Sequence, residues 1–254
     1  MDTASHLPKN PTRKATFRNW KIWRNRLRDE FINLLVQQRH FHELVAITEP
    51  YRGKSMAAEL ARSMAQGYAA FAFTAIRRIA EPAKVRQARS KEITSLPTLL
   101  KDVQANAHLV TRMHQRRRYK KAMKHLPEHT HIRVADRVHD AVSNGSDVLP
   151  AESVESDLRL IARTVKRISK LTDKVYAHIE RDRRRIPRKL GFARVDEAIH
   201  TLFGILNKYS LCLFGESIAL PQFESFSVAD DLRRIWPNDT PLPVFPSVVQ
   251  EEEP

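Results

Sequence analysis

One histidine of this chain is placed where an imidazole could act as a base. His178 lies at the margin of the apolar face of segment 151–185, in which Leu, Ile and Val recur at steps of three, four and seven, as on one face of an α-helix. The cations Arg167, Lys174 and Arg181 flank that margin. Like charge and partial desolvation lower the pKa of an imidazole in such a setting. His178 is therefore a candidate general base, although a histidine at the rim of a core helix is commonly only a packing residue.

Two adjacent arginines, Arg77 and Arg78, close an Ala-rich apolar segment that we expect to be helical from about residue 54 to residue 80. A guanidinium group can bind either a phosphate or a carboxylate through two parallel hydrogen bonds. The pair could therefore contact a phosphate of a substrate. Equally, it could pair with a carboxylate of a neighbouring helix, for which Asp173 is a natural candidate.

The densest group of cations is uninterrupted by acidic residues and predicts contact with nucleic acid. It consists of Arg112, Arg116, Arg117, Arg118, Lys120, Lys121 and Lys124, and Arg181, Arg183 and Arg184 add to it from the end of segment 151–185. Tyr119 lies within the first group as a candidate ring for stacking on a base. Most basic runs are merely solvated, so a solvated helix face is the alternative. A second group of cations near the N-terminus could likewise either bind phosphate or form a solvated helix face. It consists of Arg18, Lys21, Arg24, Arg26 and Arg28.

Three other motifs are rejected on physical grounds. The letters HLPEH at 125–129 match an inverted zinc-protease motif, but Pro127 breaks the helix that this motif needs. Gly53-Lys54-Ser55 resembles the end of a phosphate-binding loop, yet Thr48 stands where its first glycine belongs. With Cys212 as the single cysteine, a disulfide or thiolate zinc site within one chain is excluded. We expect neither a metal nor a cofactor.

Several segments together resemble a known family. The stretch KLTDKVYAHIERD, which contains His178, resembles the signature helix of the HEPN superfamily, and its closest likeness is to the abortive-infection U-type (AbiU-like) branch. AFTAIRRIAEP at 72–82 and SLPTLLKDV at 95–103 are similar to two further helices of that branch, in the same order. With VDEAIHTLFGILNKYSLCLFG after the histidine, the resemblance covers roughly the span from Phe17 to Pro237.

The resemblance implies a HEPN-like helical fold more firmly than it implies catalysis. HEPN ribonucleases resemble one another in an Arg followed, after four to six residues, by a His. Counting back from His178, the positions for that Arg are occupied by Leu171, Thr172 and Asp173, so the usual catalytic arginine is missing. The nearest cation is Lys174, one helical turn before the histidine. The resemblance also implies a homodimer with the site across its two-fold axis.

Composition and pattern point to one helical domain with an anionic partner. The chain has 254 residues, 42% hydrophobic residues, only 6 glycines and a net charge of +15, which favours nucleic acid over an anionic membrane. We expect an all-α, antiparallel bundle of about five to seven helices at 15–236, a disordered N-terminus at 1–14 and a disordered, Pro-rich acidic tail at 237–254. A signal peptide and membrane spans are not evident, so we expect a cytoplasmic protein.

The patterns also predict individual helices and their ends. We expect the helix at 54–80 to be the centre of the bundle, and a helix capped by Ser95 to run on into the basic segment 111–125. A further core helix should end at Gly215. The remaining helices are expected at 17–45, at 132–142 and, with a capping box of Ser227 and Asp230, up to Trp236.

Two functions remain open at this point. In the first, the protein is a metal-independent ribonuclease of the HEPN type, in which His178 moves protons while Lys174, Arg77 or Arg78 stabilises the phosphorane. In the second, it is a non-catalytic basic module that binds RNA, another polyanion or a cognate antitoxin or phage-defence partner. A purely structural oligomerisation role would leave the +15 charge without a purpose.

Overall fold

The computed structural model describes residues 12–48, 55–81, 95–181 and 192–219, and at residues 48, 55–58, 60–62 and 170–181 it describes the backbone alone. In this part of the chain seven α-helices and one short 3₁₀ helix are present, and no β-strand. They are α1 (Arg13–Thr48), α2 (Ser55–Ala80), α3 (Leu96–Ala105), η2 (Ala107–Leu109), α4 (Arg112–Ala122), α5 (Glu128–Ser143), α6 (Ala151–Arg181) and α7 (Phe192–Phe214). The prediction of an all-α bundle is confirmed.

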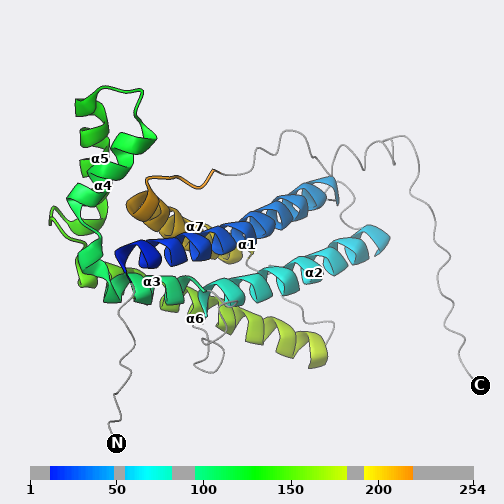
Figure 1. Ribbon diagram of the computed structural model, residues 1–254. Helices are drawn as coiled ribbons and strands as arrows, with labels where there is room; N and C mark the ends of the chain where they lie inside the picture. Colours follow the sequence, from blue (N-terminus) through cyan, green and yellow to red (C-terminus); the bar gives the residue numbers. More distant parts are fainter. Residues whose placement is uncertain (1–11, 49–54, 82–94, 182–191, 220–254) are drawn as a thin grey trace, which may run out of the picture.

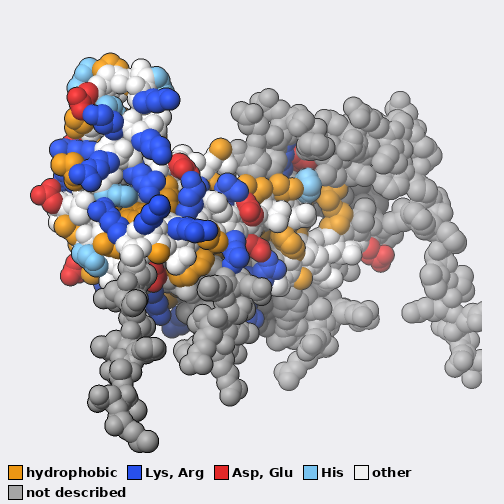
Figure 2. Space-filling view, in the orientation of Figure 1, with side chains coloured by type: hydrophobic (Ala, Val, Ile, Leu, Met, Phe, Trp, Pro, Cys, Tyr) orange, Lys and Arg blue, Asp and Glu red, His pale blue; other side chains and the backbone are white. Residues whose placement is uncertain are grey.

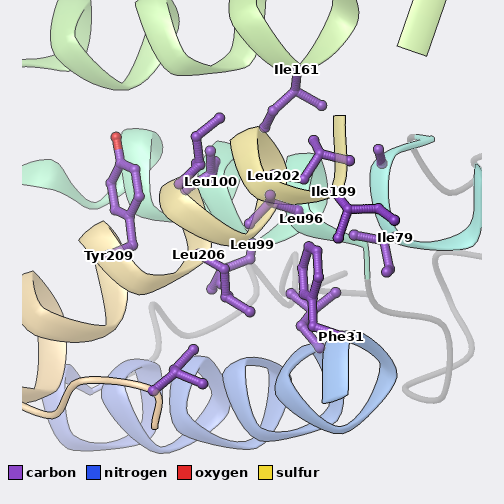
Figure 3. Packing of buried hydrophobic residues seen from close by; sticks show 14 of the residues in the cluster. Phe31, Ile79, Leu96, Leu99, Leu100, Ile161, Ile199, Leu202, Leu206 and Tyr209 are labelled. Atoms are coloured by element: carbon purple, nitrogen blue, oxygen red, sulfur yellow. The ribbon is translucent and has the colours of Figure 1, made fainter. Parts of the chain in front are cut away.

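The last of these helices, α7, occupies the middle of the bundle. It contacts α1, α2, α4, α5 and α6, and α1 and α2 run side by side along the molecule (Figure 1). Ile199, Leu202 and Leu206 are fully buried and recur at steps of three and four, so they share one face of α7. Figure 3 shows them between Phe31 of α1 and Ile161 of α6. Each such side chain contributes roughly 1.5–3 kcal/mol by leaving water.

The second helix, α2, covers this core from one side. Its residues Phe73, Ile76 and Ile79 are buried, whereas Phe71 is 41% exposed. The expectation that this helix forms the centre of the bundle is therefore wrong. Its apolar residues extend nearly all round, but neighbouring helices cover only part of its circumference, and α7 holds the central place instead.

The chain turns sharply between α3 and α4. The backbone N–H of Asn106 donates to the Asp102 carbonyl (3.1 Å) and ends α3. Thr111 then begins α4, because its hydroxyl accepts a hydrogen bond from the backbone N–H of His114 (3.1 Å) and its backbone forms a β-bridge with Val148. The prediction that the helix after Ser95 runs on into the basic segment is wrong, since this cap starts a separate helix.

Other helix ends agree with the patterns that predicted them. Ser95 accepts a hydrogen bond from the Thr98 backbone (3.4 Å) and caps α3, with Pro97 in the first turn. Pro127 precedes the first residue of α5, so it interrupts the 125–129 segment as expected. Gly215 ends α7 with a φ of 68°, in the left-handed region that glycine adopts without steric cost.

Two helices begin earlier than predicted, and two predicted segments lie outside the described residues. Helix α1 begins at Arg13, inside the 1–14 segment predicted to be disordered, because Thr12 accepts the first backbone hydrogen bond from Thr16 (3.1 Å). Helix α5 starts four residues earlier than predicted. The predicted helix up to Trp236 and the acidic tail lie outside the described residues.

Among the described helices, none is long and apolar enough to cross a membrane.

Candidate nucleic-acid interface

The predicted catalytic residues of the long helix lie where only the backbone is described. Helix α6 continues without interruption to Arg181, so the backbone at Lys174 and His178 is helical and the two residues are one turn apart. The side chains of Asp173, Lys174, His178 and Arg181 are outside the description. Arg183 and Arg184 are wholly outside the described residues.

The paired arginines at the end of α2 contact carboxylates of the bundle. The Nε atom of Arg77 donates to Glu81 (2.8 Å), one turn further along, and the Nη2 atom of Arg78 donates to Glu30 of α1. Both guanidinium groups are about 60% exposed. The structure therefore favours the second reading of this pair, carboxylate pairing, with Glu81 and Glu30 as the partners.

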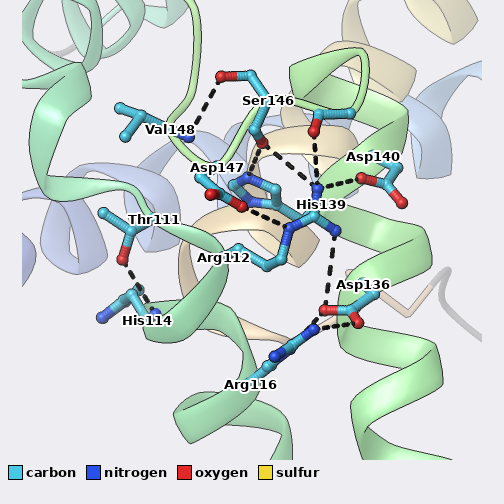
Figure 4. A network of polar contacts seen from close by, with 11 residues as sticks. Thr111, Arg112, His114, Arg116, Asp136, His139, Asp140, Ser146, Asp147 and Val148 are labelled. Carbon is cyan, nitrogen blue, oxygen red and sulfur yellow. Dashed lines mark hydrogen bonds and ion pairs between the residues drawn. The ribbon is translucent and has the colours of Figure 1, made fainter.

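Arg112, the first cation of the basic segment, points into the hairpin formed by α4 and α5. Its Nη2 atom donates to Asp140 (2.7 Å) and to the Gly145 carbonyl (3.0 Å), and its Nε atom donates to Asp147 (3.1 Å). Figure 4 shows this network between the start of α4 and the loop after α5. The hydrogen bond to Asp140 is the main cause that raises the pKa of Arg112. This side chain holds the loop in place and has few donors left for a ligand.

Two more cations of the segment bind across the same hairpin. Arg116 donates to both carboxylate oxygens of Asp136, from Nε (2.7 Å) and Nη2 (2.6 Å), which lowers the pKa of that carboxyl group. Lys120 donates to Glu128 (3.2 Å). These contacts join α4 and α5 in antiparallel register. The sequence pattern did not predict these ion pairs, because the basic segment contains no acidic residue and the carboxylates lie on the next helix, α5.

Tyr119 does not serve as a stacking ring. It is 5% exposed, and its ring lies against Gly215 at the end of α7. Its hydroxyl has no hydrogen-bond partner among the described residues. The stacking role expected from sequence is wrong, because the side of α4 that carries Tyr119 packs on the bundle.

The cations on the other side of α4 remain available. Arg117, Lys121 and Lys124 are exposed, and they make no hydrogen bond or ion pair with another described residue. On a helical wheel of about 100° per residue, Arg117, Arg118 and Lys121 lie within about 60° of His114. Since His114 faces α1, as described below, this cationic side of α4 is directed towards α1.

The opening of α1 contributes fewer free cations than its sequence suggests. Lys21 and Arg24 both donate to Glu216, and Arg24 is buried beside it. Arg28 donates to Asp29 (2.8 Å). Arg18 is exposed and makes no ion pair with the rest of the described chain.

Lys14 shares that setting and was not singled out from sequence. It precedes Arg18 by one helical turn, is exposed, and likewise makes no ion pair with a described residue. The spacing of four residues between the positive charges of Lys14 and Arg18 is the sequence signal that could have identified Lys14.

Helices α1 and α4 meet at a pair of tilted rings in contact. The Phe17 ring of α1 and the His114 ring of α4 have centroids 4.4 Å apart and are tilted by 32°. The guanidinium carbons of Arg13 and Arg118 lie 5.8 Å and 5.7 Å from the Phe17 centroid. Arg13 also donates to the Leu109 carbonyl (3.1 Å), which fixes the start of α1 beside η2.

The field at this junction is positive. Burial, followed by the charges of Arg118, Arg13 and Arg117, lowers the pKa of His114 to about 4, while a hydrogen bond with the Leu213 backbone opposes this shift. No carboxylate contributes to this shift. His139, by contrast, has its pKa lowered mainly by burial and has Asp140 and Asp147 nearby. The positive charges around His114 would therefore stabilise an anion bound at this junction.

We define the basic face as six cations at the start of α1 and on α4, of which Arg118 is half-buried and the other five are exposed. Figure 2 shows Lys and Arg side chains gathered over the hairpin and the adjoining start of α1. The members of the basic face are Arg13, Lys14, Arg18, Arg117, Arg118 and Lys121. Fixed guanidinium and ammonium groups of this kind bind phosphate oxygens by charge and by N–H donation.

The described residues do not form a metal site. No group of three or more His, Cys, Asp or Glu side chains is placed to hold an ion within them. His131 is 4% exposed, so it does not belong to a surface cluster with the exposed His125 and His129. His125, His129 and His131 therefore do not form one surface cluster.

The arrangement is that of an all-α bundle, the architecture that the resemblance to HEPN domains implies. A family model of the HEPN domains, described as AbiU2, matches residues 17–233. The chain therefore belongs to the AbiU2 family of HEPN domains, and the resemblance found in its motifs is confirmed. Membership connects the protein with abortive-infection-type defence. No curated protein and no solved structure matches the chain.

Proposed function

We propose that the protein acts in abortive-infection-type defence by binding RNA through its basic face. The observation that carries this proposal is the convergence of free cations from two helices on the Phe17–His114 junction. Arg13 from α1 and Arg118 from α4 lie near the Phe17 ring, and Arg117 of α4 acts on His114; none of the three has a carboxylate partner in the described part of the chain. The exposed Lys14, Arg18 and Lys121 on the same two helices are likewise unpaired there.

Such a convergence is unfavourable without an anion. Two unit charges 4 Å apart repel by roughly 1–4 kcal/mol near a protein surface. Within the hairpin, the protein relieves comparable repulsion with Asp136, Asp140 and Glu128, yet on the basic face it does not. The phosphates of RNA would supply the missing negative charge, and the net charge of +15 would attract them over a distance.

The test is the salt dependence of RNA binding. Each phosphate contact that is lost reduces the slope of log affinity against log salt by about 0.7–0.9. The double variant Arg117→Gln/Lys121→Gln should therefore lower the slope by about 1.4–1.8. A matched control, Lys101→Gln/Lys166→Gln, removes two exposed cations from α3 and α6 and should leave the slope nearly unchanged. Equal slopes for wild type and the α4 variant would refute a role for the basic face.

A second candidate function is metal-independent cleavage of RNA centred on His178. It is favoured by family membership together with the unbroken helix that places Lys174 one turn before His178. Wild type would cut RNA in EDTA and leave 2′,3′-cyclic phosphate ends, and His178→Ala would lose most of that activity. Wild type that binds RNA but never cuts it would leave the binding function alone.

Dimerisation through α6 is part of this second candidate. HEPN sites that form across a two-fold axis need two copies, so sedimentation at micromolar concentration should show a homodimer. A strict monomer would remove the composite site. A cognate antitoxin or defence partner would be sought by co-purification with the natural neighbours of the gene.

A further inference from the structure

We infer that the basic face recognises double-helical stretches of RNA through their phosphates and does not bind unpaired bases by stacking. This inference rests on the proposed RNA binding and specifies its substrate class. Proteins that hold single strands combine a cationic groove with exposed aromatic rings, each worth about 1–3 kcal/mol per base. Proteins that hold duplex RNA contact phosphates and 2′-hydroxyls. The two classes therefore differ in whether rings are exposed among the cations.

The rings near the basic face are covered. Phe17 is 6% exposed, Trp20 is 0% exposed and Tyr119 is 5% exposed. Phe17 is further enclosed by the guanidinium groups of Arg13 and Arg118 and by the His114 ring. Among the described Phe, Tyr and Trp side chains, the one with a large exposed area is Phe71, which belongs to α2. No ring of the basic face is placed to receive a base.

The cations themselves stand on rigid, regularly spaced positions. Lys14 and Arg18, like Arg117 and Lys121, are four residues apart, which is about 6 Å along a helix axis. Lys124 follows α4 in the turn after its last residue, Ala122, and is also exposed. Thr111 caps α4, and the bidentate Arg116–Asp136 contact fixes it against α5, so the row is pre-organised.

A pre-organised cationic row favours a pre-organised polyanion. A duplex carries its phosphates on a stiff frame and has twice the axial charge density of one strand, whereas a single strand loses conformational entropy when it is aligned on fixed cations. Without stacking to offset that loss, the duplex should bind more tightly. The same reasoning predicts little dependence on base sequence, because phosphates are the same at every position.

The experiment is a competition assay with the full chain and a fluorescent RNA duplex of about 16 base pairs, a length that one duplex-binding domain covers. The unlabelled duplex should compete about tenfold better than either of its strands, and a scrambled duplex should compete equally well within about twofold. Oligo(A) and oligo(U) should compete equally weakly. A strand that competes as well as the duplex, or oligo(A) that competes far better than oligo(U), would overturn the inference.

Two variants separate this inference from the proposed function. Phe17→Leu removes the ring that Arg13 and Arg118 contact but keeps an apolar side chain, so the affinities for single strand and duplex should change by the same factor within about twofold, since Phe17 does not stack on a base. A folded Phe17→Leu protein that loses single-strand affinity but keeps its duplex affinity would also overturn the inference. If Phe17→Leu does not fold, the double variant Arg117→Gln/Lys121→Gln tests the inference instead. Relative to wild type, its duplex affinity must fall by a larger factor than its single-strand affinity. If wild type binds neither RNA, the proposed function itself fails.

Discussion

The lowered pKa of His114 allows a direct test of how this ring is packed and charged at the junction between α1 and α4. Replacing His114 by Gln removes the titrating ring while keeping a polar side chain of similar length. At pH 7 the ring is neutral in both the folded and the unfolded chain. As the pH falls, the unfolded chain takes up a proton near 6.5, whereas the folded chain does so only near 4. The unfolded state therefore binds more protons in that window, and wild-type stability must fall as the pH is lowered through it.

The magnitude follows from the size of the shift. A change from 6.5 to about 4 corresponds to at most about 3 kcal/mol of unfolding free energy. Because the ring is only partly buried, solvent screening reduces this to roughly 1.5 kcal/mol. A loss of that size lowers the melting temperature by about 3–6 °C in a protein of this length.

The assay is urea unfolding of wild type and of His114→Gln at pH 7 and pH 4.5. Wild type should lose roughly 1.5 kcal/mol more than the variant over this interval. His125→Gln is the matched control, since His125 is exposed and should follow wild type. The imidazole of His114 can be followed directly by NMR. Parallel pH profiles for wild type and His114→Gln, or a His114 pKa near 6.5, would refute both the burial of this ring and the positive field that we describe at this junction.

Three further outcomes test the fold. Gly215→Ala should destabilise the protein by about 1–2 kcal/mol in chemical denaturation, since φ is positive there; no loss would mean that the turn relaxes. Tyr209→Phe should cost about 1–3 kcal/mol, because its hydroxyl donates to Asp157 (2.9 Å). A double-mutant cycle with Asp157→Asn should show coupling, and additive losses would contradict the contact. Cys212 should resist thiol reagents until unfolding, because burial raises its pKa to about 12; rapid native labelling would be incompatible with its position.

Features that depend on a few neighbouring residues were predictable from sequence. The Ser95 cap, the interruption at Pro127 and the stop at Gly215 follow from side-chain and backbone chemistry within a few residues. The apolar repeat of α7 likewise predicted a core helix, because one period of 3.6 residues decides which face is buried. The position of α7 at the centre was not predictable, since it depends on which other helices pack around it.

The candidate site shows the same division more sharply. Sequence alone determined that the chain is helical and strongly basic, and it carried the motifs of the AbiU2 family. Only the tertiary structure decided which cations are free, because Arg112 and Arg116 find their carboxylates 20 or more residues away, across a hairpin, while Arg117 and Lys121 stay exposed and unpaired within the described residues. It also decided that Tyr119 is buried. A charge run is a property of the chain, but the field it presents depends on packing, since pairing and desolvation are set by neighbours that are distant in sequence.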